Sequence, residues 1–130
     1  MKNINSKKVF IVAVALSGVV LNILYGVTLL KEFFDTQYNG AIREVLISSI
    51  ILEFTWALLL LWVILNPFER RQIFLFTMIP ILSGNILHSI SQQMDGHGSY
   101  VTVIWNTIFG LFYAGLYAVA FFFGKPDKKE

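Results

Sequence analysis

Residues 45–65, VLISSIILEFTWALLLLWVIL, decide the fold, because they form 21 consecutive residues with a single charge. A helix needs about 20 predominantly apolar residues to cross the hydrocarbon core of a bilayer. The segment is followed by Asn66-Pro67, and proline disfavours helical geometry in the residue before it. We therefore expect a membrane-spanning helix that stops at this dipeptide.

The whole chain has the composition of a membrane protein. Of its 130 residues, 56% are hydrophobic and only 14% are charged, whereas about 25% are charged in an ordinary soluble domain. Three further windows are long and apolar enough to span a bilayer: residues 9–30, 73–93 and 101–123. Because a segment in lipid must satisfy its own backbone, each window is expected to be a helix. The predicted fold is an all-α, four-transmembrane-helix, up-and-down bundle in which residues 1–130 form a single domain.

The basic residues are distributed unevenly between the two ends of this predicted bundle. One side holds eight of the ten: Lys2, Lys7, Lys8, Arg70, Arg71, Lys125, Lys128 and Lys129. The other side holds only Lys31 and Arg43. Cytoplasmic loops carry the excess of Lys and Arg. We therefore expect a multi-pass protein of the cell membrane with both termini in the cytoplasm.

Glu53 stands out, because it lies in the middle of an otherwise apolar window. A charged residue at the bilayer centre costs roughly 2.5–3.5 kcal/mol on insertion scales, and an ionisable residue there is a functional-site hypothesis by default. His88 is the other deep ionisable residue and is the predicted partner of Glu53. The further candidates for ligand binding are Asn22, Tyr25, Ser49, Trp56, Asn85, Gln92, Asn106 and Tyr113.

These polar residues are expected to share faces and depth. Positions three and four apart lie on one side of a helix, which predicts one polar stripe per span. Asn22, Glu53 and Asn85 each lie eight residues from the expected outer end of their span, or about 12 Å at 1.5 Å per residue. The stretches 10–16 and 57–65 are almost entirely apolar. We expect a polar pocket that opens outward and is closed towards the cytoplasm by apolar packing.

A purely structural interpretation applies to several of these residues. Asn and Ser side chains in membrane helices often serve only as hydrogen bonds between helices. Asn22, Ser49 and Asn106 can all act in this way. Glu53 and His88 differ from them in being ionisable.

The pattern favours binding or transport of a small amphipathic or cationic ligand, coupled to protons through Glu53 and His88. Two alternatives remain open. The protein can be a membrane-embedded enzyme acting on a lipid-like substrate, with Glu53 and His88 as candidate catalytic acid and base. It can also be a non-catalytic accessory subunit whose polar interior fixes helix register.

No cofactor and no metal are expected. The chain has no cysteine, and a zinc site from Glu53, His88 and His97 would need a loop histidine to reach down into the membrane. The expected partners are the lipid bilayer, the small ligand and, where access alternates across the membrane, a second copy of the chain. Nucleic acid is not expected, because the basic residues are short flanks of the spans.

Overall fold

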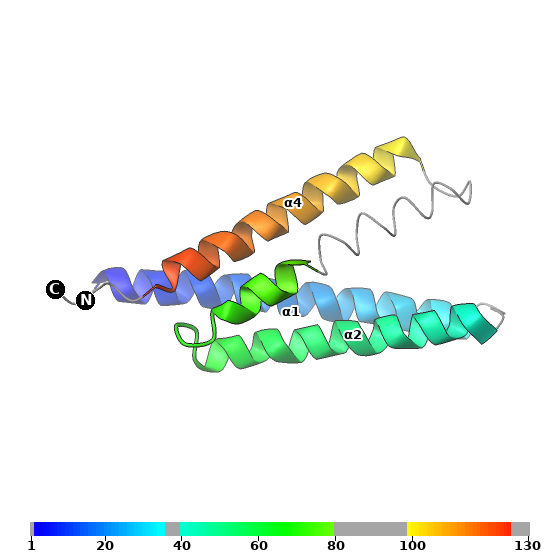
Figure 1. Ribbon diagram of the computed structural model, residues 1–130, viewed down its shortest axis with the longest axis horizontal. Coiled ribbons are helices and arrows are strands. Elements are labelled where there is room, and N and C mark those ends of the chain that lie inside the picture. The colour runs from blue at the N-terminus through cyan, green and yellow to red at the C-terminus, as the bar shows by residue number, and fades with distance from the viewer. Residues whose placement is uncertain (1, 36–39, 80–98, 126–130) are drawn as a thin grey trace.

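The computed structural model describes residues 2–35, 40–79 and 99–125. These residues form helices and turns, with no strand among them (Figure 1). Helix α1 comprises Lys2–Asp35, α2 comprises Gly40–Leu65 and α4 comprises Tyr100–Phe123, while residues 72–79 are also helical. The all-helical prediction is thus confirmed for the described part of the chain.

Three of the helices are long and apolar enough to cross a membrane. Their candidate spans are Ser6–Phe34, Arg43–Leu65 and Tyr100–Phe123, which contain three of the four windows predicted from the sequence. The fourth window, residues 73–93, is described only as far as residue 79. Pro80, a residue type that kinks helices, falls inside this window and lies outside the described residues.

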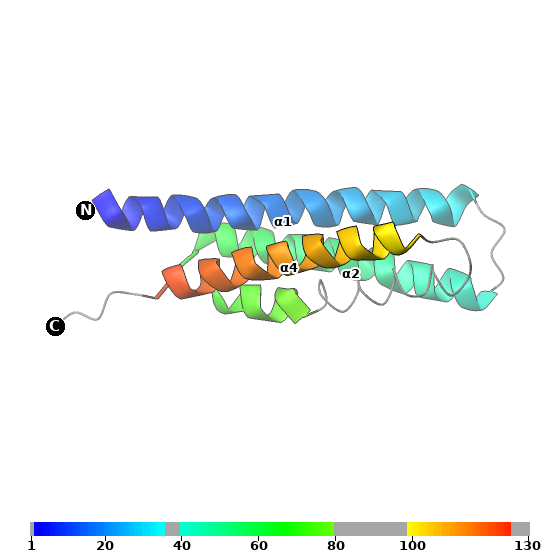
Figure 2. The same cartoon turned by 90° about the horizontal axis from the view of Figure 1, so that it is seen from above.

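Helices α1 and α2 lie side by side and run in opposite directions, and α4 runs in the direction of α2 (Figures 1 and 2). The start of α1, residues 66–71 and the end of α4 therefore lie at one end of the molecule. We call it the basic end, because it carries Lys7, Lys8, Arg70, Arg71 and Lys125. The opposite end holds the end of α1 and the starts of α2 and α4.

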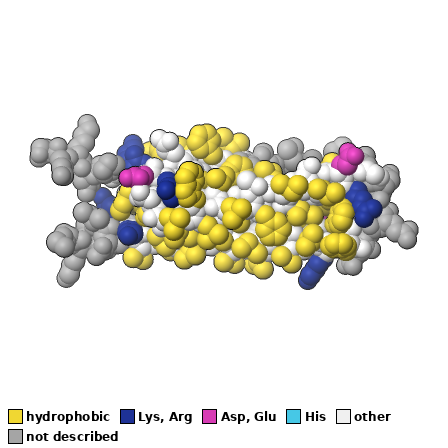
Figure 3. Space-filling model, turned by 90° about the horizontal axis from the view of Figure 1, so that it is seen from below, with side chains coloured by type: hydrophobic (Ala, Val, Ile, Leu, Met, Phe, Trp, Pro, Cys, Tyr) yellow, Lys and Arg dark blue, Asp and Glu magenta, His cyan; other side chains and the backbone are white. Residues whose placement is uncertain are grey.

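The surface between the two ends is apolar. Figure 3 shows hydrophobic side chains over the middle of the molecule, with charged side chains towards both ends. Helix α4 contributes Ile104, Trp105 and Ile108, each more than half exposed. An apolar band between two charged rims is the surface expected of a protein surrounded by lipid.

The helix ends follow local sequence. Helix α2 stops at Leu65, and the Asn66 amide donates to the carbonyl of Val63 at 3.1 Å, as Asn66-Pro67 predicts. Helix α4 begins after Ser99, whose hydroxyl accepts a hydrogen bond from the Val101 amide at 3.2 Å, a common N-cap.

Helices α1 and α2 are longer than their predicted windows at the end where they are joined. Helix α1 continues to Asp35, five residues past the predicted boundary, and α2 begins at Gly40, five residues before it. The flanks are rich in Lys, Glu, Arg and Ala, which are good helix formers in water, and neither flank contains proline. Both helices therefore continue beyond their apolar windows.

The buried core lies in the half of the molecule nearest the basic end. Its ten residues, which we call the basic-end core, are Ile11, Val14, Ala15, Val19, Ala57, Leu60, Val63, Phe74, Tyr117 and Ala120. They come from α1, α2, α4 and residues 72–79. The apolar stretches at residues 10–16 and 57–65 contribute most of the α1 and α2 members.

Three helices meet at Gly18 in this core. A Cβ atom on Gly18 would lie 2.1 Å from the Tyr117 hydroxyl and 2.7 Å from Cδ1 of Leu60. Small residues let membrane helices approach closely, and here only a glycine fits between the two side chains. The Tyr117 ring also packs against Phe74, with ring centroids 5.2 Å apart.

Residues at the basic end fasten the turn after α2 to its neighbours. The Arg71 guanidinium donates to the carbonyl of Gly124 and lies 5.6 Å from the Phe121 ring. A cation at this position interacts favourably with the negative end of α4. Arg70 donates to the Trp62 carbonyl at 2.9 Å and lies 4.4 Å above the Trp62 ring.

Candidate functional site

The exposure pattern along α2 defines an inward stripe. Its less exposed positions recur every three or four residues and comprise Leu46, Ser49, Ile50, Glu53, Trp56, Ala57, Leu59, Leu60, Val63 and Ile64. Leu52, Phe54 and Leu58 lie between them and are exposed. The predicted face of Ser49, Glu53 and Trp56 therefore belongs to the side of α2 that packs inward.

Glu53 lies against α1 at Gly26. A Cβ atom on Gly26 would be 3.4 Å from Cβ of Glu53 and 3.3 Å from Cε2 of Phe54. The base of the Glu53 side chain thus rests on the backbone of α1. Tyr25 precedes Gly26 on α1 and is exposed.

The position of Glu53 along its span is central. It lies ten residues from Arg43 and twelve from Leu65, the bounds of the candidate span on α2. At 1.5 Å per residue this is about 15 Å from one boundary, which is half the thickness of a typical hydrocarbon core of about 30 Å. Among the described residues, no hydrogen bond or ion pair to the Glu53 carboxylate is seen.

Asn22 and Trp56 lie between the contacts that α2 makes at Gly18 and at Gly26 of α1. Asn22 is buried, and its amide nitrogen donates to the Gly18 carbonyl of its own helix at 2.6 Å. The indole nitrogen of Trp56 is buried and has no hydrogen-bond partner within the described part of the chain. Asn22 therefore uses its donor in a structural contact, whereas Trp56 keeps a donor one turn away from Glu53.

Two of the candidate residues, Tyr113 and Asn106, lie on α4. Tyr113 is half-buried, and its ring lies 5.0 Å from that of Phe109 and 6.1 Å from that of Tyr117. These contacts connect Tyr113 to the basic-end core. Asn106 is half-buried on the same face of α4, one turn before the buried Gly110. The predicted residues Asn85, His88 and Gln92 lie outside the described residues.

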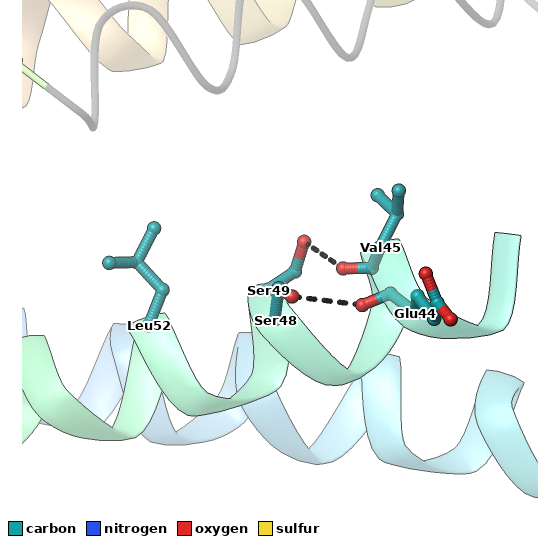
Figure 4. A pocket seen from close by; sticks show the side chains of 5 residues that line it. All are labelled: Glu44, Val45, Ser48, Ser49 and Leu52. Atoms are coloured by element: carbon teal, nitrogen blue, oxygen red, sulfur yellow. Dashed lines mark hydrogen bonds between the residues drawn. The ribbon is translucent and has the colours of Figure 1, made fainter. Parts of the chain in front are cut away.

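A shallow, open groove lies beside the first half of α2, towards the end of the molecule opposite the basic end. Its volume is about 560 Å³, and its lining among the described residues comes from Glu44, Val45, Ser48, Ser49 and Leu52. Figure 4 shows Val45, Ser49 and Leu52 rising from one side of α2. We call it the α2 groove.

Two serine hydroxyls in the α2 groove are bonded to their own helix. Ser48 donates to the Glu44 carbonyl and Ser49 to the Val45 carbonyl, each at 2.9 Å (Figure 4). Their oxygen lone pairs can still accept hydrogen bonds from a ligand. Ser49 belongs both to this groove and to the inward stripe that holds Glu53.

Of the lining residues, the sequence had pointed only to Ser49. Glu44 precedes residue 45, where hydropathy predicts that the span begins, so the sequence places it outside the span. The spacing of four residues between Glu44 and Ser48, which places both on one face of a longer helix, could have revealed it.

Comparisons with models of protein families, with curated proteins and with solved structures find no match. Function is therefore inferred from the residues and their geometry.

The chemistry available around Glu53 is that of a single carboxylate in an apolar setting. It can hold one positive charge or exchange one proton, and the Trp56 indole can donate one hydrogen bond. Aromatic rings of Tyr25, Phe54 and Trp56 lie on or next to the helical turn of Glu53. Aromatic faces attract organic cations.

Proposed function

We propose that this chain is a multi-pass membrane protein that binds, or carries across the membrane, a small cationic or amphipathic ligand with Glu53 as its charge partner. The observation that carries the proposal is the placement of Glu53: central in its span, on the inward stripe and seated on Gly26. A charge at this depth costs roughly 2.5–3.5 kcal/mol. A bound cation or a proton offsets that cost.

In the proposed arrangement the protein lies in the cell membrane. Residues 73–93 supply a fourth span, and both termini lie in the cytoplasm. The charges of the described residues support this orientation. Among the side chains that the structure describes, the basic end carries five cations against Glu69, whereas Lys31 and Arg43 at the opposite end are accompanied by Glu32 and Glu44. By the positive-inside rule the basic end faces the cytoplasm, so the α2 groove opens outward and the basic-end core closes the inner side.

Binding is proposed to be coupled to protons. A cation that replaces a proton on Glu53 releases that proton, and His88 is the sequence-based candidate for a second titrating group. Neutral Glu53 without a ligand and ionised Glu53 with one would each leave the span with no net charge at this position. Both states avoid the cost of an unpaired charge in lipid.

The test is a titration of the purified protein in lipid nanodiscs with triethylammonium and related amines. Isothermal calorimetry in two buffers of different ionisation enthalpy reports affinity and proton release together. We expect Glu53→Gln to lower affinity at least about tenfold, equivalent to about 1.4 kcal/mol, and to abolish proton release. Glu32→Gln, which makes the same change at the exposed end of α1, should leave both unchanged. His88→Ala should alter proton release.

Equal binding and proton release by wild type and Glu53→Gln would overturn the proposal. Recovery of a chemically altered compound after incubation with wild type would favour the enzyme alternative.

A further inference from the structure

We infer that the α2 groove is where the ligand first contacts the protein, and that Glu44 captures a protonated amine there before it reaches Glu53. This inference rests on the proposed function. It assigns the ligand's chemical class and adds Glu44, Ser48 and Ser49 as residues that act on it.

The first step concerns the charge at the groove. Glu44 is exposed, lines the groove, and has no ion pair within the described part of the chain. Its neighbour Arg43 has its guanidinium 4.7 Å from the Phe33 ring, on α1. That contact holds the Arg43 charge towards α1. Lys31 and Glu32, also on α1, are the other described charges at this end.

The second step concerns the class of cation. The groove offers one carboxylate, two hydroxyl oxygens and two apolar side chains, Val45 and Leu52. Calcium takes six to eight oxygen ligands, and magnesium needs near-ideal octahedral geometry, so this lining suits neither ion. An amine with apolar substituents matches it better, because its N–H groups can donate to the carboxylate and to the hydroxyl oxygens of Ser48 and Ser49.

The third step connects the groove to Glu53. Glu44 and Glu53 are nine residues apart on one continuous helix, or about 13.5 Å. Ser49 lies between them in sequence. It lines the groove and also belongs to the inward stripe. Ser49 thus offers a polar group between the two carboxylates, and the ligand passes from an exposed acid to a half-buried one in the middle of the span.

Exposure predicts different roles for the two acids. A charge at the rim of a site acts mainly on the association rate and its dependence on salt, whereas a desolvated partner acts on dissociation. Glu44 is therefore expected to control how fast the amine arrives. Glu53 is expected to control how long it stays.

The experiment uses Trp56 as a reporter. The chain has three tryptophans, so the Trp62→Phe/Trp105→Phe variant leaves one, a single turn from Glu53. Rapid mixing of this variant in nanodiscs with triethylammonium gives association and dissociation rates from its fluorescence. Tetraethylammonium serves as the matched probe, because it carries the same charge without an N–H donor.

We expect Glu44→Gln to slow association about three- to tenfold at low ionic strength, with the effect shrinking as salt is added. Dissociation should change less than twofold. Glu32→Gln removes the same charge at the same end of the molecule, outside the groove, and should have little effect. Ser49→Ala should weaken binding of triethylammonium about fivefold and leave tetraethylammonium unchanged.

Three results would overturn the inference while leaving the proposed function intact, provided that Glu53→Gln still lowers affinity at least about tenfold and abolishes proton release. In the first, Glu44→Gln and Glu32→Gln slow association equally. In the second, Glu44→Gln changes the dissociation rate alone. In the third, Ser49→Ala changes the affinity for the two probes equally. Failure of wild type to bind either probe would instead overturn the proposed function and this inference with it.

Discussion

The two halves of this molecule use the same helices for different purposes. Towards the basic end, Ile11, Ala15 and Tyr117 are completely buried, and three helices close around Gly18. Towards the opposite end, the described side chains of α1 and α4 are far more exposed, with Leu24 at 59% and Trp105 at 66%. Buried apolar packing is therefore concentrated in the half towards the basic end.

The contacts at Gly18 and Gly26 differ in the same way. At Gly18 there is no room for a Cβ atom, whereas at Gly26 the nearest atoms lie at the tight edge of ordinary contact. The helices are thus packed more tightly at Gly18 than at Gly26. The predictions that follow challenge this contrast, beginning with the largest effect.

Gly18→Ala should lower the free energy of unfolding by about 2–3 kcal/mol, the upper part of the usual range of about 1–3 kcal/mol for overpacking. The added methyl would meet the Tyr117 hydroxyl at 2.1 Å and Leu60 at 2.7 Å, so helices must move apart. Thermal unfolding in detergent, followed by intrinsic fluorescence, measures the loss. Gly115→Ala is the matched control, because a Cβ there has no atom within 4 Å, and it should be neutral or slightly stabilising.

Adding Tyr117→Phe to Gly18→Ala should recover part of that loss, because it removes the nearest clashing atom. An unchanged melting temperature in Gly18→Ala alone would show that the basic-end core is not locked at this point.

Glu53→Leu should raise the free energy of unfolding by about 2 kcal/mol, because it removes an ionisable group from the centre of a span. The same change should abolish ligand binding. Stability measured by denaturant titration, alongside the calorimetric assay, separates the two effects. Thr55→Leu, on an exposed position of α2, controls for added hydrophobic surface. A large loss of stability in Glu53→Leu would mean that Glu53 is a structural residue and would favour the accessory-subunit alternative.

Tyr117→Phe as a single substitution should stabilise the protein by about 1 kcal/mol. The Tyr117 hydroxyl is buried and has no hydrogen-bond partner among the described residues, and an unsatisfied buried polar group costs about 1–3 kcal/mol. Tyr113→Phe, at a half-buried ring on the same face, should change the melting temperature much less. Destabilisation by Tyr117→Phe would instead reveal that this hydroxyl is bonded in the membrane.

Gly26→Ala should lower the free energy of unfolding by less than about 1 kcal/mol. The added methyl would lie 3.3 Å from the edge of the Phe54 ring, which is exposed enough to swing aside, and alanine favours the helix more than glycine does. Thermal unfolding under the conditions used for Gly18→Ala gives a direct comparison. A loss equal to that of Gly18→Ala would erase the distinction between the two halves.

Much of this organisation can be predicted from periodicity and length. The windows around residues 9–30, 45–65 and 101–123 fall inside observed helices, and the Asn66-Pro67 stop is where α2 ends. The inward face of Ser49, Glu53 and Trp56 follows from helical spacing. These features depend on local sequence, which a single chain displays in full.

The remainder depends on how one helix is placed against another. Gly18 and Tyr117 are 99 positions apart in sequence, and no local pattern shows that one touches the other. The pairing of Glu53 with Gly26 likewise requires the register between α1 and α2. Glu44 was missed for a different reason, because hydropathy locates the lipid boundary and not the end of the helix.

The contact between Arg71 and the Gly124 carbonyl also has a consequence for biosynthesis. The two residues are 53 positions apart, so the contact cannot form until α4 has been synthesised and inserted. Until then the Arg71 guanidinium lacks the carbonyl that it binds in the finished protein. A chain that stalls before Gly124 is therefore without this link between the turn after α2 and the end of α4.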